Sequence, residues 1–123
     1  MNKLRKIEFR GRKIDSTEWV YGNLVSLFDD KGSAGTGIAV GSELHLVDSK
    51  TIGQYTGIKD KSGMKKIYEG DILEYGYIVT YVDGSDTTNL GMDVGFYEQR
   101  DDFESYGKLI VGEEYAVIGN IYK

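Results

Sequence analysis

His45 is the only histidine in this 123-residue chain, so any catalytic or metal-binding site built on imidazole must use it. A Ser-His-Asp triad would take this histidine as its base, but no G-x-S-x-G turn marks a nucleophile. A transition-metal site would need carboxylates for all its other ligands, because the chain contains no Cys and no second His. We therefore expect His45 to be a surface or partly packed strand residue. We expect no catalytic residue, no metal, no cofactor and no enzyme activity.

Three further patterns resemble binding or acid/base sites. The segment Gly32–Gly37, GSAGTG, is Gly-rich like a phosphate loop, but it lacks the Gly-Lys-Ser/Thr ending and no helix follows. We expect a flexible loop there. The segment Asp83–Asp93 offers oxygen ligands that suit Ca²⁺ without the spacing of an EF-hand, so ion binding there stays open. The carboxylate pairs at 101–102 and 113–114 are adjacent in sequence, so on a strand they would point to opposite faces.

The N-terminal arm is basic, because Glu8 is the only acidic residue among six Lys and Arg side chains in residues 1–13. Such an arm could contact phosphates, and exposed tyrosines could stack on bases. The expected interaction residues are Lys3, Arg5, Arg10, Arg12, Tyr75 and Tyr77. Residues 67–123, with three basic and 12 acidic side chains, would repel phosphates. Nucleic-acid binding is therefore the alternative function, and a solvated basic arm is the favoured interpretation.

β-Strands must position these residues, because apolar and polar side chains alternate along most of the chain. With 17 Gly and no Pro, the tight turns must be made by Gly. The clearest predicted strand is DILEYGYIVTYV, a central strand in which Gly76 permits a bend. The best helical candidate is EQRDDFESYG. Trp19 begins the apolar run WVYGNLVSLF and is expected in the core.

The segment Gln54–Tyr75 has the features of a scaffold. We expect Gly57 and Gly70 to turn the chain at positive φ, and Asp60–Gly63 to form a hairpin turn with Gly63 left-handed. An Asx-type turn and two buried tyrosine rings complete the scaffold. The expected structural residues of the chain are Trp19, Tyr55, Gly57, Gly63, Tyr68, Gly70 and Asp71.

The predicted fold is mainly β and forms a single domain over residues 1–123. Five or six short strands after Lys65, separated by Gly-containing turns, indicate a small antiparallel, partly open barrel. The opening GDILEY resembles the start of SH3-type barrels. We therefore predict an SH3-like barrel over residues 67–123 and an N-terminal β-rich segment over residues 1–66.

Three ordered motifs resemble the YopX-like family of phage and prophage proteins: FRGRKIDSTEWVYGNLV, TIGQYTGIKDKSGMKKIYEGDILEY and VIGNIY. The resemblance implies a mainly β protein with an SH3-like barrel, encoded by a mobile element and without assigned catalytic or ligand residues. Proteins of this kind often continue beyond IGNIY with an acidic, Pro-containing tail, and here the sequence ends at Lys123.

The expected function is that of a non-catalytic protein-binding or assembly module. Residues 1–66 carry 12 basic and eight acidic side chains, so the two parts of the chain are oppositely charged and favour a homo-oligomer. A host or phage protein is the other expected partner. No apolar stretch approaches the roughly 18 residues of a membrane span, and the basic start precedes no signal-peptide core. We expect a cytoplasmic protein of a bacterial host cell that does not contact the membrane.

Overall fold

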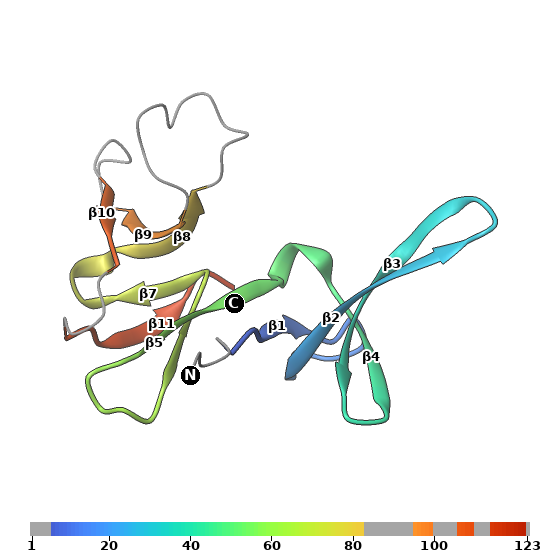
Figure 1. Ribbon diagram of the computed structural model, residues 1–123, viewed down its shortest axis with the longest axis horizontal. Helices are drawn as coiled ribbons and strands as arrows, with labels where there is room; N and C mark the ends of the chain where they lie inside the picture. Colours follow the sequence, from blue (N-terminus) through green and yellow to red (C-terminus); the bar gives the residue numbers. More distant parts are fainter. Residues whose placement is uncertain (1–5, 83–94, 100–105, 110–113, 123) are drawn as a thin grey trace, which may run out of the picture. The chain divides into compact units, whose positions relative to one another are not determined.

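The computed structural model describes residues 6–82, 95–99, 106–109 and 114–122 (Figure 1). Within these residues the chain forms antiparallel β-strands and two short 3-10 turns and contains no α-helix. The predicted mainly β fold is therefore confirmed. The strands form two sheets that are not closed, and the SH3-like barrel stays a prediction. The chain divides into two compact units, Met1–Gly57 and Ile58–Lys123.

The first unit is an antiparallel sheet in which the strand order is β4-β3-β2-β1-β5. The last of these strands continues past Gly57 into the second unit, where β6 follows it in the strand order. A 3-10 turn, η1, connects β4 to β5. The elements are β1 Phe9–Arg12, β2 Trp19–Asp29, β3 Gly32–Val40, β4 Glu43–Val47, η1 Ser49–Thr51 and β5 Gly53–Lys59.

A long hairpin of β2 and β3 replaces the loop predicted for GSAGTG, which is the first part of β3 (Figure 1). Asp29 pairs with Gly32, so the turn consists of only Asp30 and Lys31. The glycines disfavour a strand by propensity, but the apolar run of β2 supplies a partner along the whole segment. The predicted loop was therefore wrong.

Two glycines of the first unit lie where there is little room for a side chain. Ile38 is fully buried, and a Cβ on Gly22 would lie 2.2 Å from the carbonyl oxygen of Ala39 on the neighbouring strand. A Cβ on Gly11 would likewise lie 3.0 Å from Val47. Gly22 is required because a Cβ there would overlap the backbone of β3, whereas a Cβ on Gly11 would crowd the Val47 side chain.

Trp19 is half-buried, which corrects its predicted place in the core. It pairs directly with Arg12, and Arg10 lies two residues along the same face of β1. The guanidinium carbons of Arg10 and Arg12 lie 4.7 Å and 5.5 Å from the centre of the indole ring. Cations therefore cover this ring where apolar side chains were expected.

The second unit contains a sheet with the strand order β10-β9-β8-β7-β11. Its buried core consists of Ile67, Leu73, Val79 and Leu109, with partly buried apolar side chains packed around them. Its elements are β6 Lys66–Tyr68, β7 Asp71–Leu73, η2 Glu74–Gly76, β8 Ile78–Val82, β9 Gly95–Gln99, β10 Tyr106–Lys108 and β11 Val117–Asn120.

The predicted strand DILEYGYIVTYV is a hairpin, so the prediction of one continuous central strand was wrong. Tyr75 and Gly76 have φ values of 70° and 79°, and the chain reverses there. Ile72 then pairs with Ile78. The alternating pattern predicted one strand because both arms of the hairpin alternate and only Gly76 hinted at a bend.

The segment EQRDDFESYG, predicted as a helix, belongs to strands at both of its described ends. Glu98 and Gln99 close β9, while Tyr106 and Gly107 open β10. Residues 100–105 lie outside the described residues.

The positive φ values predicted for the glycines of Gln54–Tyr75 are confirmed, although Gly57 lies within β5 and does not end a strand. Gly57, Gly63 and Gly70 have φ values of 88°, 73° and 94°. The Gly63 N–H donates to the Asp60 carbonyl at 2.8 Å, closing the predicted hairpin turn.

The two predicted buried tyrosines are present, and the predicted Asx-type turn at Asp71 is replaced by a hydrogen bond to the backbone three residues earlier. The buried Asp71 carboxylate accepts a hydrogen bond from the Tyr68 N–H at 2.8 Å. Tyr55 and Tyr68 are buried, as expected from their place in the motif.

Candidate functional site

A groove of about 170 Å³ lies in the second unit, between the β7–β8 reversal and the segment 114–116. One of its lining residues, Leu73, also belongs to the buried core of this unit. Carboxylate and aromatic side chains make up most of the remaining lining. The lining residues are Leu73, Glu74, Tyr75, Tyr77, Glu98, Glu114, Tyr115 and Ala116.

Backbone hydrogen bonds fix the two walls of the groove against each other. The Glu74 N–H donates to the Ala116 carbonyl at 3.0 Å, and the Lys61 N–H donates to the Tyr115 carbonyl at 2.7 Å. Within the reversal, the Leu73 N–H donates to the Tyr77 carbonyl at 2.7 Å. The groove therefore lies on a hydrogen-bonded frame.

Three tyrosines line the groove, and the rings of two of them, Tyr75 and Tyr77, lie close together. Tyr75 is 83% exposed, whereas Tyr77 is half-buried. Their ring centres lie 6.0 Å apart with an angle of 42° between the ring planes. Both residues were expected to take part in an interaction, and the structure brings them together.

The charge of the groove is negative. The Lys61 ammonium donates to Glu74 Oε1 at 3.0 Å, which raises the pKa of Lys61 above its ordinary value of 10.5, and the charge of Glu114 adds to this shift. Among the described residues, no three acidic or imidazole side chains are grouped in a way that could hold a metal ion. This carboxylate arrangement therefore suits an organic cation, as its contact with Lys61 illustrates.

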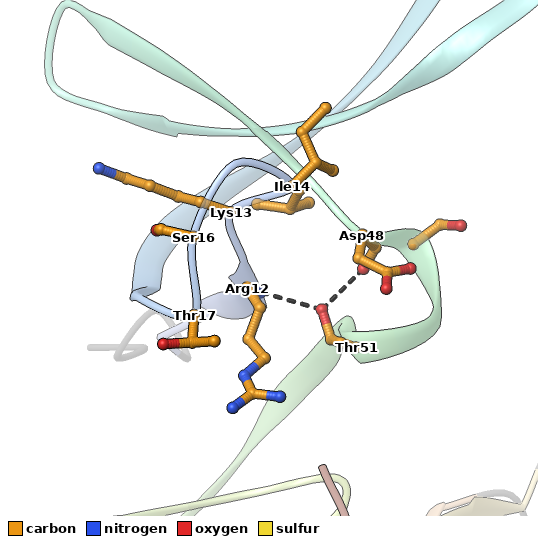
Figure 2. A pocket seen from close by; sticks show the side chains of 9 residues that line it. Arg12, Lys13, Ile14, Ser16, Thr17, Asp48 and Thr51 are labelled. Carbon is orange, nitrogen blue, oxygen red and sulfur yellow. Dashed lines mark hydrogen bonds between the residues drawn. The ribbon is translucent and has the colours of Figure 1, made fainter. Parts of the chain in front are cut away.

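A larger pocket, of about 440 Å³, lies in the first unit around Arg12, Lys13 and Thr51 (Figure 2). The Arg12 N–H donates to Thr51 Oγ1 at 2.9 Å, and the Thr51 hydroxyl donates to the Asp48 carbonyl at 2.7 Å. The side chains of Arg12 and Lys13 point away from each other, and Lys13 Nζ lies 3.3 Å from Glu18 Oε2. These polar groups hold β1, β4 and η1 together and do not converge on a ligand.

The described part of the basic arm places two of its arginines over the Trp19 ring. Arg10 is 5% exposed and lies over Trp19, so its predicted role as an interaction residue is corrected to a structural one. Arg12 is half-buried over the same ring. Lys3 and Arg5 lie outside the described residues.

The remaining candidates from the sequence are distributed over both units. His45 is partly packed on β4, as expected, with Nε2 3.6 Å from Glu43 Oε2. Asp83–Asp93, the pair 101–102 and Glu113 lie outside the described residues. Glu114 is exposed and lines the groove.

The sequence did not identify the acidic part of the groove. Glu74, Glu98 and Glu114 come from three separate segments, and no spacing connects them. The only available signal was the acidic excess of the C-terminal part. The second unit has 13 Asp and Glu against seven Lys and Arg.

Comparison with known proteins identifies the family. A family model described as YopX protein matches residues 8–123, which is nearly the whole chain and agrees with the resemblance of the three sequence motifs. No curated protein matches the chain significantly. Within the described residues, no helix has the length and apolar character needed to span a membrane. The chain belongs to the YopX protein family.

Proposed function

We propose that this protein is a non-catalytic binding module whose groove in the second unit receives a lysine or arginine side chain of a partner protein. The observation that carries this proposal is the joint presence of three tyrosines, two of them with neighbouring rings, and three carboxylates around one groove. Aromatic faces attract cations, and carboxylates form charge-assisted hydrogen bonds with ammonium and guanidinium groups.

The size of the groove also favours a single side chain. Pockets for drug-sized ligands have volumes of about 300–1,000 Å³, and this groove has about 170 Å³. A metabolite of nucleotide size would therefore exceed it, whereas the end of a long basic side chain is of a suitable size.

Nucleic acid fits the same groove poorly. Bases stacked on Tyr75 and Tyr77 would bring their phosphates near Glu74, Glu98 and Glu114. Repulsion between these charges opposes such a complex. A cationic segment would be attracted by both the tyrosine rings and the carboxylates of the groove, whereas a polyanion would be attracted by the rings alone.

Selection from a random peptide library tests this function. We expect the wild-type protein to enrich peptides with Lys or Arg at a fixed position, and Tyr75→Ser to lose this enrichment. Tyr21→Ser is the matched control, because Tyr21 is also exposed but lies on β2 in the first unit. Enrichment of acidic or apolar peptides, or enrichment that survives Tyr75→Ser, would overturn the proposal. A single-stranded oligonucleotide that binds the wild type and not Tyr75→Ser would favour the nucleic-acid alternative.

A further inference from the structure

The strand β4, Glu43–Val47, forms one end of its sheet, where it pairs with β3 and, at Val47 alone, with Lys13. Natural proteins protect such an edge with Lys, Pro or a β-bulge, since exposed strand edges pair readily with other chains. The sequence of β4, ELHLV, contains neither Lys nor Pro. Its pairing with β3 runs without a register shift. Glu43 is therefore the charged residue of this strand, and neither Lys, Pro nor a bulge protects its edge.

The backbone of β4 is covered on its outer side at one end only. The Ile14 N–H donates to the Leu46 carbonyl at 3.2 Å, and the Asp48 N–H donates to the Arg12 carbonyl at 2.8 Å. These bonds show that the peptide groups of Leu46 face outward. Because strand residues alternate, the N–H and C=O of Leu44 face outward too. Among the described residues, no other segment hydrogen-bonds to Leu44 on that side.

The side chains leave this edge accessible. Leu44 leans inward over β3, where its Cδ1 lies 2.8 Å from the position that a Cβ on Gly37 would occupy. Leu44 and Leu46 are 49% and 47% exposed and lie on the same face of the sheet. A strand added beside β4 would therefore meet apolar surface next to free peptide groups.

We propose that β4 of a second copy of this chain pairs with this edge, antiparallel and with Leu44 opposite Leu44. Both leucines then exchange backbone hydrogen bonds, and Glu43 of each copy lies opposite His45 of the other. These two groups already approach each other within one chain, with Nε2 3.6 Å from Oε2. Any register centred on Leu46 is blocked, because residues 12–14 occupy that part of the edge. This pairing does not involve the groove of the second unit.

Disulfide trapping tests the register directly, since the chain contains no Cys and an introduced thiol is unique. Residues 43 and 45 of the two copies would form a non-hydrogen-bonded pair with Cα atoms about 4.5 Å apart, within the range of about 4.4–6.8 Å that disulfides require. In a mixture of Glu43→Cys and His45→Cys under a glutathione redox buffer, we expect the mixed dimer to form faster than either homodimer. Mass spectrometry distinguishes the three products.

Two controls distinguish specific pairing of two β4 strands from random collision between two thiols. Met64→Cys places a thiol on an 87% exposed side chain outside β4, and it should crosslink more slowly than the mixed pair. Sedimentation velocity should show that Leu44→Lys loses a dimer that the wild type and Met64→Lys retain. A wild type that stays monomeric, or a mixture without preference for the 43–45 link, would overturn the proposal. Neither result bears on the proposed peptide binding, which is tested separately with the Tyr75→Ser variant.

Discussion

At the residue scale, Tyr75 combines backbone strain with an exposed ring. It is the non-Gly residue with positive φ among those described, and its side chain is 83% exposed. A left-handed conformation costs a residue with a Cβ roughly 1–2 kcal/mol. The ring of Tyr75 contributes little buried area to offset this cost. A residue that strains the chain without packing into it is expected where function requires its side chain.

Replacement of Tyr75 by Asn should therefore stabilise the fold while removing the ring. Because Asn tolerates the left-handed region, we expect Tyr75→Asn to raise the free energy of unfolding by about 0.5–1 kcal/mol. Urea denaturation measures the change, with Tyr77→Asn as the half-buried comparison. A loss of more than 1 kcal/mol would indicate that the ring of Tyr75 serves packing.

Two strand glycines provide a second test at this scale. Gly22→Ala would place a Cβ 2.2 Å from the Ala39 carbonyl oxygen, whereas Gly119→Ala meets nothing within 4 Å. We expect the first change to destabilise the protein by about 1–3 kcal/mol or more, and the second to stay within about 0.5 kcal/mol. Equal melting temperatures of the two variants would contradict the close approach of β2 and β3.

At the scale of elements, the turn Asp60–Gly63 is held by a carboxylate. Asp60 Oδ1 accepts hydrogen bonds from the Ser62 hydroxyl and from the Ser62 N–H. The hydroxyl bond is the main cause that lowers the pKa of Asp60 below its ordinary value of 3.8, and the N–H groups of Lys65 and Ser62 add to it. The turn therefore favours the charged form of this side chain.

This shift predicts a dependence of stability on pH. A carboxylate whose pKa is lower in the folded state contributes stability above pH 3.8, and this contribution is lost as the pH falls through the lowered value. We expect the melting temperature of the wild type to exceed that of Asp60→Asn at pH 6, and the difference to shrink below about pH 3.8. Circular dichroism across this range measures both proteins. A difference that stays constant with pH would show that the charge of Asp60 is not involved.

The elements also show how far the sequence predicts this fold. Alternation identified most strands, because burial of one strand face leaves a period-2 pattern. The turn at Gly63 was identified by its turn-forming residues, Asp60–Gly63. Alternation failed at Tyr75–Gly76, where a reversal joins two alternating arms, and at GSAGTG, where pairing outweighs the poor strand propensity of Gly. Tyr75 and Tyr77 of the groove were named from the sequence as interaction residues for a nucleic acid, and Tyr115 was not. The carboxylates of the groove were not named either, since only the fold brings Glu74, Glu98 and Glu114 together.

At the scale of the whole molecule, charge is distributed differently from the expectation based on residues 1–66 and 67–123. The compact units divide after Gly57, so Lys59, Lys61, Lys65 and Lys66 belong to the acidic unit. The first unit then has eight basic and seven acidic residues and is nearly neutral. Attraction between oppositely charged parts is therefore a weak basis for self-association.

Self-association through β4 should accordingly depend little on salt. Backbone hydrogen bonds and leucine contacts are not screened by ions, in contrast to exposed ion pairs. We expect the dimer to persist between low and high salt in sedimentation equilibrium. A dimer that dissociates as salt rises would indicate contact between charged surfaces instead.

The central claim is that the groove recognises a cationic side chain, and an NMR titration tests it most directly. Nα-acetyl-arginine N-methylamide is the ligand, and the corresponding citrulline compound is its neutral control. We expect saturable shifts at the amides of Glu74, Tyr75 and residues 114–116 with arginine and none with citrulline. Glu98→Gln should weaken binding by about 1.4- to fivefold, because an exposed ion pair contributes about 0.2–1 kcal/mol. Shifts that do not saturate, or that are equal for arginine and citrulline, would contradict the account.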